Sequence, residues 1–484
     1  MIIAPVTWIG IGLAVALIGA LWAGAVDRSV IARQRALVSS SLAFLCTLAA
    51  WIEAIWRVSK AEEGGGAWPG VLTVDPVNGP LLPLVALLCL ATIAATLRSK
   101  MRRFSFARIL LLEALLLATL AAKTPWALIA LLGLSSLPPA FEMRVRGRSL
   151  RVYLLHMGMS MACLVSGWWL VSRGESQSSE SALWGFALLA AGVAIRAGLV
   201  PAHCWVIDLF GKASFGTALV VVAPIPGAYA AVRLLAAGAP DGVMHALTLG
   251  ALGTAVLSAA MSLTQTDARR LFARIFLTHA SLVLAGIALS TRLGMTAGFC
   301  LWLSAPLALV GVGLTLRSLE ARTGRLSLRS FLGLHVQVPT FAALFLFTGL
   351  SAVGFPGTLG FFGVEMLTDA AARVSKPLAL LVIVSTAIGG IALLRAYAVL
   401  FLGASHRATV DLRIRRVELA ALLALVVLLL GGTLWPQLGI ERRSRAAGAI
   451  LDLRERHAQA ASGRPRSDSR DEGAREQAAG RPSP

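Results

Sequence analysis

The chain has 484 residues, of which 57% are hydrophobic and only 14% are charged, and its mean hydropathy is +0.78. Because a soluble domain carries roughly 25% charged residues, the composition excludes an ordinary soluble protein and predicts an all-α integral membrane protein in a lipid bilayer. The formal net charge of +20 does not indicate a nucleic-acid partner, since the basic residues lie mostly in short loops between apolar runs.

Apolar runs long enough to cross a bilayer recur along the chain. The first, residues 2–26, has no basic region before it and no clear small-residue cleavage site, so we interpret it as an uncleaved first helix rather than a signal peptide. We expect about 14 transmembrane helices, near residues 4–24, 37–56, 80–97, 105–122, 125–141, 150–172, 182–201, 215–236, 243–263, 271–290, 296–316, 339–358, 377–402 and 417–436.

Basic residues gather in the loops that follow most odd-numbered spans. This pattern predicts that those loops are cytoplasmic and that both termini lie outside, whereas the basic residues after the last span favour the opposite orientation. The basic loops include Arg98, Lys100, Arg102, Arg103, Arg144, Arg146, Arg148, Arg269, Arg270, Arg317, Arg322, Arg325 and Arg329.

Arg196 is a charged residue inside the seventh apolar span. A charge at membrane depth costs several kcal/mol, so such a residue usually faces a protein interior or a water-filled path. Pro201, five residues later, removes a backbone donor and breaks the helix, which is tolerated at this depth mainly beside a cavity. The alternative is that Arg196 lies near a helix end and extends its side chain to the interface.

A second break is predicted at Pro356 and Gly357, in the twelfth span. Two interrupted segments five spans apart indicate two inverted five-helix repeats, with helices 7 and 12 broken. Pro356 and Gly357 ending a helix at the interface is the alternative. The predicted organisation is residues 1–104 for helices 1–3, 105–236 for the first repeat, 243–402 for the second repeat, 417–440 for the final helix and 441–484 for a disordered polar tail, in which a short interfacial helix at 446–461 is the alternative to disorder.

The cysteines do not predict a redox centre. There are five, no two form a CxxC pair, and each lies in or beside an apolar segment. Metal and iron–sulfur sites need clustered thiolates, and no G-x-G-x-x-G follows a strand in a soluble domain. We therefore expect no metal, no cofactor and no redox chemistry in this chain, which leaves open whether it is part of an enzyme.

The amino-acid sequence around the two breaks resembles that of a known superfamily. Residues 196–205 read R-A-G-L-V-P-A-H-C-W, followed by Asp208, and residues 356–362 read P-G-T-L-G-F-F. Residues 264–271, 134–138 and 434–437 give further likenesses in the expected order. Together they resemble the antiporter-like membrane subunits of respiratory complex I, a superfamily that includes the L, M and N subunits of NADH-quinone oxidoreductase, multisubunit cation/proton antiporters and membrane hydrogenases.

The chain departs from the family pattern at the residues that matter most for its chemistry. The resemblance implies a glutamate in the fifth helix and a lysine in the seventh, where this chain has Gly133 and Arg196. A buried lysine can lose its proton, but an arginine in a protein effectively cannot. Arg196 can therefore act as a fixed charge and not as a relay.

The remaining titratable groups supply the candidates for a proton path. Glu365 is the strongest, with Lys376 and Arg395 as possible partners, and the alternative is a carboxylate at a helix end facing water. His279 falls in the middle of a span and titrates near neutrality when unperturbed, although a satisfied core histidine fits the sequence equally well. The predicted proton-path residues are Arg196, His203, His279, Glu365 and Arg395.

Three functions fit the sequence. The resemblance implies a proton-conducting subunit of a complex I-like NADH-quinone oxidoreductase assembly, in the inner (cytoplasmic) membrane, with other membrane and peripheral subunits as partners. The lost Glu–Lys pair suggests a degenerate scaffold that no longer pumps. The third is the membrane subunit of an inorganic-carbon uptake complex.

Overall fold

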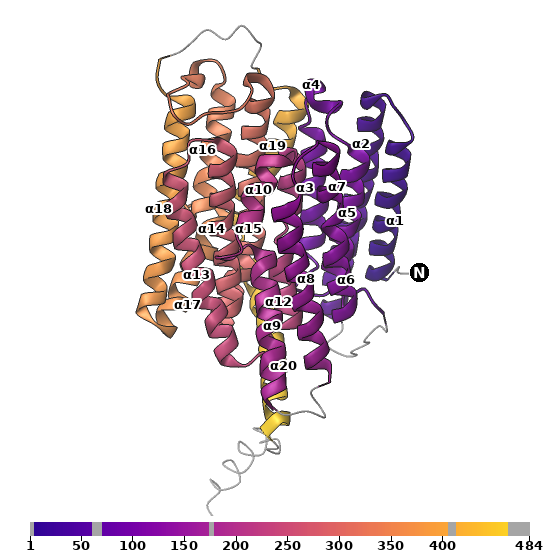
Figure 1. Ribbon diagram of the computed structural model, residues 1–484, viewed down its shortest axis with the longest axis vertical. Coiled ribbons are helices and arrows are strands. Elements are labelled where there is room, and N and C mark those ends of the chain that lie inside the picture. The colour runs from indigo at the N-terminus through magenta and orange to yellow at the C-terminus, as the bar shows by residue number, and fades with distance from the viewer. Residues whose placement is uncertain (1–3, 61–69, 174–178, 405–412, 463–484) are drawn as a thin grey trace, which may run out of the picture.

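The computed structural model describes residues 4–60, 70–173, 179–404 and 413–462. Within these ranges the regular structure is helical, apart from two isolated β-bridges. Eleven helical segments are long and apolar enough to cross a membrane, and Figure 1 shows them packed side by side in one bundle. The chain is therefore a multi-pass membrane protein, as its composition predicts.

The first helices form one edge of the bundle. Helix α1 begins at Pro5, where the fixed φ of proline suits the first helical position, and packs against α2 and α5. Its outer face carries exposed Leu17, Ile18 and Leu21, which suits contact with lipid. The helices of this edge are α1 (Pro5–Gly24), α2 (Ser29–Lys60), α3 (Leu81–Ala94) and the short α4 (Arg98–Met101).

The next part of the chain contains three interrupted passes. The sequence predicts single spans at 125–141 and 215–236, but the structure breaks the first at Ser136 and the second at 223–225, where Ile225 has φ +48°. The predicted break after Arg196 is present at 198–203. The helices are α5 (Phe106–Ala121), α6 (Pro125–Ser135), α7 (Leu137–Val145), α8 (Arg151–Ser172), α9 (Ser179–Ala197), α10 (Cys204–Lys212), α11 (Phe215–Val222) and α12 (Pro226–Leu234).

The following part has one interrupted pass, at residues 354–358, which is where the break at Pro356 and Gly357 is predicted. The helix after this break, α17, was not predicted as a separate element because it is amphipathic and shorter than a spanning helix. The helices are α13 (Asp241–Leu263), α14 (Ala268–Ala288), α15 (Arg292–Thr323), a 3₁₀ turn (Leu334–Val336), α16 (Pro339–Val353), α17 (Leu359–Val374) and α18 (Lys376–Phe401).

The C-terminal part corrects one prediction. Helix α19 (Arg416–Leu434) is followed directly by α20 (Pro436–Ser462), so residues 441–462 of the predicted disordered tail are helical. Arg454 of α20 donates hydrogen bonds to the Ala236 carbonyl and to Asp241, and these contacts hold the helix against the bundle. Residues 463–484 lie outside the described ranges. Figure 1 places α20 at the end of the bundle opposite α4.

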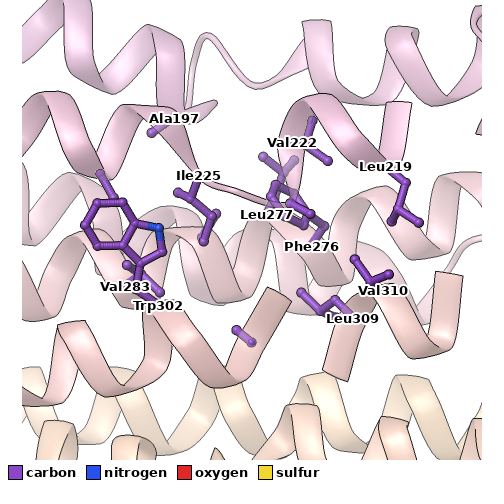
Figure 2. Packing of buried hydrophobic residues seen from close by; sticks show 14 of the residues in the cluster. Ala197, Leu219, Val222, Ile225, Phe276, Leu277, Val283, Trp302, Leu309 and Val310 are labelled. Carbon is purple, nitrogen blue, oxygen red and sulfur yellow. The ribbon is translucent and has the colours of Figure 1, made fainter. Parts of the chain in front are cut away.

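The core lies where α11, α14 and α15 meet. Helices α14 and α15 are buried along their spanning windows, and Figure 2 shows Leu219, Phe276 and Leu309 from the three helices packed together. Trp302 of α15 donates its indole N–H to the Pro224 carbonyl at 2.8 Å. That bond satisfies a carbonyl exposed by the break between α11 and α12, so the interruption is built into the core.

Two glycines allow α14 and α15 to approach closely. A Cβ on Gly286 would lie 2.7 Å from the Cα of Gly298, which is backbone and cannot move aside cheaply. Small residues at such crossings are typical of membrane helix pairs.

We therefore expect Gly286→Ala to lower the free energy of unfolding by about 1–3 kcal/mol through overpacking, measured by thermal unfolding in detergent. The matched control is Gly253→Ala in α13, where a Cβ meets nothing within 4 Å; it should be neutral or stabilising by about 0.5–1 kcal/mol. Equal effects of the two substitutions would contradict the close approach.

Candidate functional site

Arg196 lies in the last turn of α9 and is only 5% exposed. Its Nη2 donates to the Ser135 hydroxyl at 2.9 Å, and its Nη1 lies 2.8 Å from the Met157 sulfur. Its Nε has no hydrogen-bond partner, and no carboxylate pairs with the guanidinium, among the residues that the structure describes. Arg196 is thus a buried cation held by neutral groups, and it does not extend to the interface.

The break after Arg196 follows from the local sequence. Gly198 adopts φ +78°, a conformation that favours glycine, and Pro201 has no N–H to continue the helix. Trp205 donates its indole N–H to the Ile195 carbonyl at 2.8 Å, and Val200 N–H donates to the Thr254 hydroxyl at 3.0 Å. The bond from Val200 satisfies a backbone N–H that the interruption would otherwise leave unpaired in the bilayer, and the bond from Trp205 gives the Ile195 carbonyl a second donor beside the Gly198 N–H.

The carbonyl ends of two helices compensate the charge of Arg196. Helix α9 ends one residue after it, and α6 ends at Ser135, to which the guanidinium is bonded. A helix C-terminus carries a partial negative charge of about half a unit. Tyr153 lies beside the guanidinium and donates its hydroxyl to the Ser136 carbonyl at 3.2 Å. The Ser135 and Tyr153 hydroxyls and the carbonyl end of α9 therefore supply the polar surroundings of Arg196.

Gly133 lies on α6, two residues before Ser135. A Cβ at Gly133 would approach the Met161 Cε to 3.1 Å, so a larger side chain would have to displace that methionine. A cavity of about 10 Å³, lined by Arg196, Trp205 and Phe276 among others, adjoins the site and matches the space of a single water. The site therefore combines a permanent cation with neutral acceptors and little free volume.

His279 lies at the second interruption, on α14. Its Nε2 is 2.7 Å from the Ala352 carbonyl and its Nδ1 is 2.8 Å from the Ile275 carbonyl, and the side chain is 4% exposed. In a helix the Ala352 carbonyl would accept from the residue four positions on, but that residue is Pro356, which has no N–H. His279 therefore satisfies a carbonyl that the break leaves free.

The number of hydrogen bonds that His279 can donate to these two carbonyls depends on its protonation state. A neutral imidazole donates from one nitrogen only, whereas an imidazolium donates from both. With Nε2 donating to Ala352, the Nδ1 faces the Ile275 carbonyl without a proton unless the ring is charged. Uptake of a proton at His279 would therefore add a hydrogen bond from Nδ1 to the Ile275 carbonyl within α14, and it would place a positive charge on the ring that is already bonded to the end of α16.

The other predicted residues do not form one group. Glu365 lies on the exposed side of α17 and has no ion pair within the described ranges. Arg395 donates instead to the carbonyls of Leu263 and Gln265, and Lys376 is exposed. The pairing of Glu365 with Lys376 or Arg395 is therefore not formed.

His203 lies apart from these residues, in the segment before α10. It is half-buried, its Nε2 is 4.0 Å from the Cys204 sulfur, and its Nδ1 has no partner among the described residues. Its chain position belongs to the break between α9 and α10.

Sequence reasoning missed the residues that hold Arg196. Ser135, Tyr153 and Met157 belong to α6 and α8, distant in the chain from α9. For Ser135 alone the sequence offers a signal, the pair Ser135-Ser136 before Pro138 in an otherwise apolar run; nothing in the sequence marks Tyr153 or Met157. Glu113 is also buried and accepts from the Ser40 hydroxyl at 3.1 Å, while Arg108, five residues earlier on the same helix, lies over the Phe141 ring.

Comparison with known proteins gives one family. The family model described as "NADH:quinone oxidoreductase/Mrp antiporter, TM" matches residues 149–389. NADH-quinone oxidoreductase subunit N of Halorhodospira halophila is 27% identical over 229 residues, which cover 45% of this chain and 47% of that relative. NAD(P)H-quinone oxidoreductase chain 4 1 of Synechococcus elongatus is 26% identical over 337 residues, covering 64% of this chain and 63% of that relative. The chain spans less than two thirds of the length of each.

Solved structures share the fold over nearly the whole chain. A chain of respiratory complex I from Thermus thermophilus with bound NADH has a TM-score of 0.81 at 22% identity and covers 92% of this chain and 99% of its own. A chain of the Mrp complex from Dietzia sp. DQ12-45-1b has a TM-score of 0.78 at 20% identity, covering 91% and 98%. Both are chains of multi-subunit membrane complexes.

Proposed function

The chain belongs to the superfamily of antiporter-like membrane subunits, and from that premise we propose that it is a proton-conducting membrane subunit of a complex I-like assembly. We place it in the bacterial inner membrane, with other membrane and peripheral subunits as partners. The matched relatives named above carry bacterial names and are quinone oxidoreductase subunits, and the structural neighbours are chains of larger complexes.

The arrangement of passes supports 14 spans with two inverted five-helix repeats. Between 105 and 236 the passes are α5, α6–α7, α8, α9–α10 and α11–α12; between 243 and 402 they are α13, α14, α15, α16–α17 and α18. In each group the fourth pass is interrupted. Figure 1 has the chain rising from α9 to α10 and descending from α16 to α17, the opposite directions that inverted repeats require.

The observation that carries the proposal is a buried basic group at the interrupted fourth pass of each repeat. The two groups differ in chemistry. Arg196 keeps its proton and is a permanent barrier charge in the first repeat. His279, bonded to the end of α16, is able to take up and release a proton. We therefore assign conduction to the second repeat and an electrostatic block to the first.

Glu365 and Arg395 have other roles in the proposed path than Arg196 and His279. Glu365 is exposed on α17, so it would join a path only where a partner subunit covers this helix. Arg395 binds the carbonyl end of α13, and we assign it a positioning role. His203, with a free Nδ1, is proposed to lie on the entry side of Arg196.

The test is proton flux in proteoliposomes that contain the assembly purified with its partners, driven by an imposed potassium diffusion potential and followed with a trapped pH dye. We expect flux above that of empty liposomes, and a decrease with Glu365→Gln if α17 is covered in the assembly. Unchanged flux in Glu365→Gln would remove that residue from the path. No flux from the native assembly with partners bound would contradict conduction and leave the scaffold function in its place.

A further inference from the structure

A basic pocket opens at the end of the bundle where α4 lies. Five helix ends lie there: the C-terminal ends of α3, α7 and α15 and the N-terminal ends of α11 and α14. The cavity has a volume of about 200 Å³, and its charged lining is Lys100, Arg103, Arg146, Arg269, Arg317 and Glu320. We define this set as the basic pocket.

The cations of the basic pocket outnumber the carboxylates that neutralise them. Arg269 pairs with Glu320 through two nitrogens, each at 2.7 Å. Arg146 pairs with Glu142 at 2.8 Å. The other three cationic side chains, Lys100, Arg103 and Arg317, have no carboxylate partner in the described part of the chain.

The preference of basic residues for cytoplasmic loops does not explain where Arg317 lies. It lies within α15 rather than in a loop, and its guanidinium donates to the Thr92 carbonyl and the Thr96 hydroxyl, both at 2.8 Å. The Phe104 ring lies 4.8 Å below the guanidinium carbon. Neutral acceptors and a ring thus fix the orientation of a charge beside the cavity and leave it without a carboxylate partner within the described ranges.

Guanidinium and ammonium groups converging on one cavity match the oxygens of a phosphate group. The outer face of α7, directly before Arg146, supplies room for lipid chains, because Phe141 and Val145 are 59% and 62% exposed there. Basic pockets between membrane helices on the side rich in Lys and Arg bind phospholipid headgroups.

We propose that the basic pocket binds a phosphate group, and that this phosphate belongs to the headgroup of an anionic phospholipid in the leaflet at the α4 end. The site is separate from Arg196 and His279, so the proposal is independent of proton conduction.

The test uses the purified assembly, stripped of lipid in detergent, and the double variant Lys100→Gln/Arg103→Gln. Both side chains are exposed and form no hydrogen bond within the described ranges, so the fold should persist. Binding is measured by native mass spectrometry and by thermal stabilisation with cardiolipin, phosphatidylglycerol or phosphatidylcholine, and separately with inorganic phosphate and pyrophosphate. The matched control is Arg144→Gln/Arg270→Gln, two exposed arginines at the same end outside the pocket lining.

We expect retention and stabilisation by the two anionic lipids only, and affinity weakened roughly tenfold or more in the pocket variant but not in the control. Stabilisation by pyrophosphate or phosphate that the pocket variant loses would support the phosphate site and overturn the lipid source. Equal losses in both double variants would assign the effect to general surface charge and overturn the proposal, as would an absence of binding by any of these ligands. Capture of an acidic protein subunit at the pocket in place of lipid would also overturn it.

Discussion

Replacing Arg196 by glutamine is expected to raise the passive proton leak of the reconstituted assembly roughly tenfold or more. A proton that passes about 4 Å from a fixed unit charge meets a repulsion of about 4 kcal/mol at an effective dielectric constant of 20, and a tenfold change in rate needs only about 1.4 kcal/mol. Glutamine removes the charge, keeps a polar side chain and leaves more room beside the small cavity that adjoins Arg196. The measurement is dye-detected proton entry down an imposed pH gradient, with no potassium diffusion potential applied.

The same substitution should leave the free energy of unfolding within about 1–2 kcal/mol of the native value. The lost hydrogen bond to Ser135 is offset because an unpaired buried cation no longer has to be desolvated. Arg33→Gln is the control, since Arg33 also donates to the carbonyl end of a helix, at Ala94, but lies in the N-terminal edge. A fall in driven flux with Arg196→Gln, in place of a rise in leak, would mean that the first repeat conducts and that the barrier role is wrong.

The two fourth-pass breaks were predictable because proline and glycine act locally. Pro201 and Pro356 each remove a donor inside an apolar run, and no tertiary information is needed to expect a break there. The break at Ile225 was missed although Pro224 and Pro226 flank it, because a hydropathy window sees one continuous apolar span. Helix α17 was missed for the opposite reason: its polar face lowers its hydropathy, so only the packed structure identifies it.

The site was less predictable than the fold. The sequence identifies Arg196 as unusual from its type and depth alone. It contains no information that Ser135 and Met157 meet it, because these residues come from other helices and the contacts depend on how α6 and α8 pack on α9. The bond between His279 and Ala352 joins residues 73 positions apart. For Glu365 the prediction failed in the opposite direction: a carboxylate in this sequence context suggested a proton-path residue, but the packing of α17 leaves its side chain exposed.

Gly133 and Arg196, which stand where the family resemblance implies a glutamate and a lysine, are chemically linked. A glutamate at Gly133 would need space that Met161 occupies, and a lysine at Arg196 would need a carboxylate to tune it. With the carboxylate absent, the helix ends at Ser135 and Ala197 provide the negative potential, and that potential does not titrate. If the family pattern holds, the proposed first repeat keeps the interrupted helix without a titratable pair, and this is the reason for proposing that His279 conducts.

Replacing His279 by leucine should lower potential-driven proton flux at least about tenfold, because the second interruption then has no group to take up a proton; this is again a change of about 1.4 kcal/mol in barrier height. The free energy of unfolding should also fall, by about 1–3 kcal/mol, since the Ala352 carbonyl would be buried without a donor. Flux and thermal unfolding are measured on the same preparation, so that loss of fold is separated from loss of conduction.

His279→Gln separates the two roles of the histidine. The glutamine amide can donate to the Ala352 carbonyl and so restore stability, but it cannot bind a proton. We therefore expect near-native unfolding, low flux, and a residual flux that does not change between about pH 5 and pH 8, the range in which an imidazole titrates. Native-like flux in His279→Gln would show that the hydrogen bond alone matters and that protons pass by another route. Because Arg196→Gln is expected to raise leak while His279→Gln lowers driven flux, opposite signs from the two repeats would distinguish a barrier from a relay in a way that neither variant does alone.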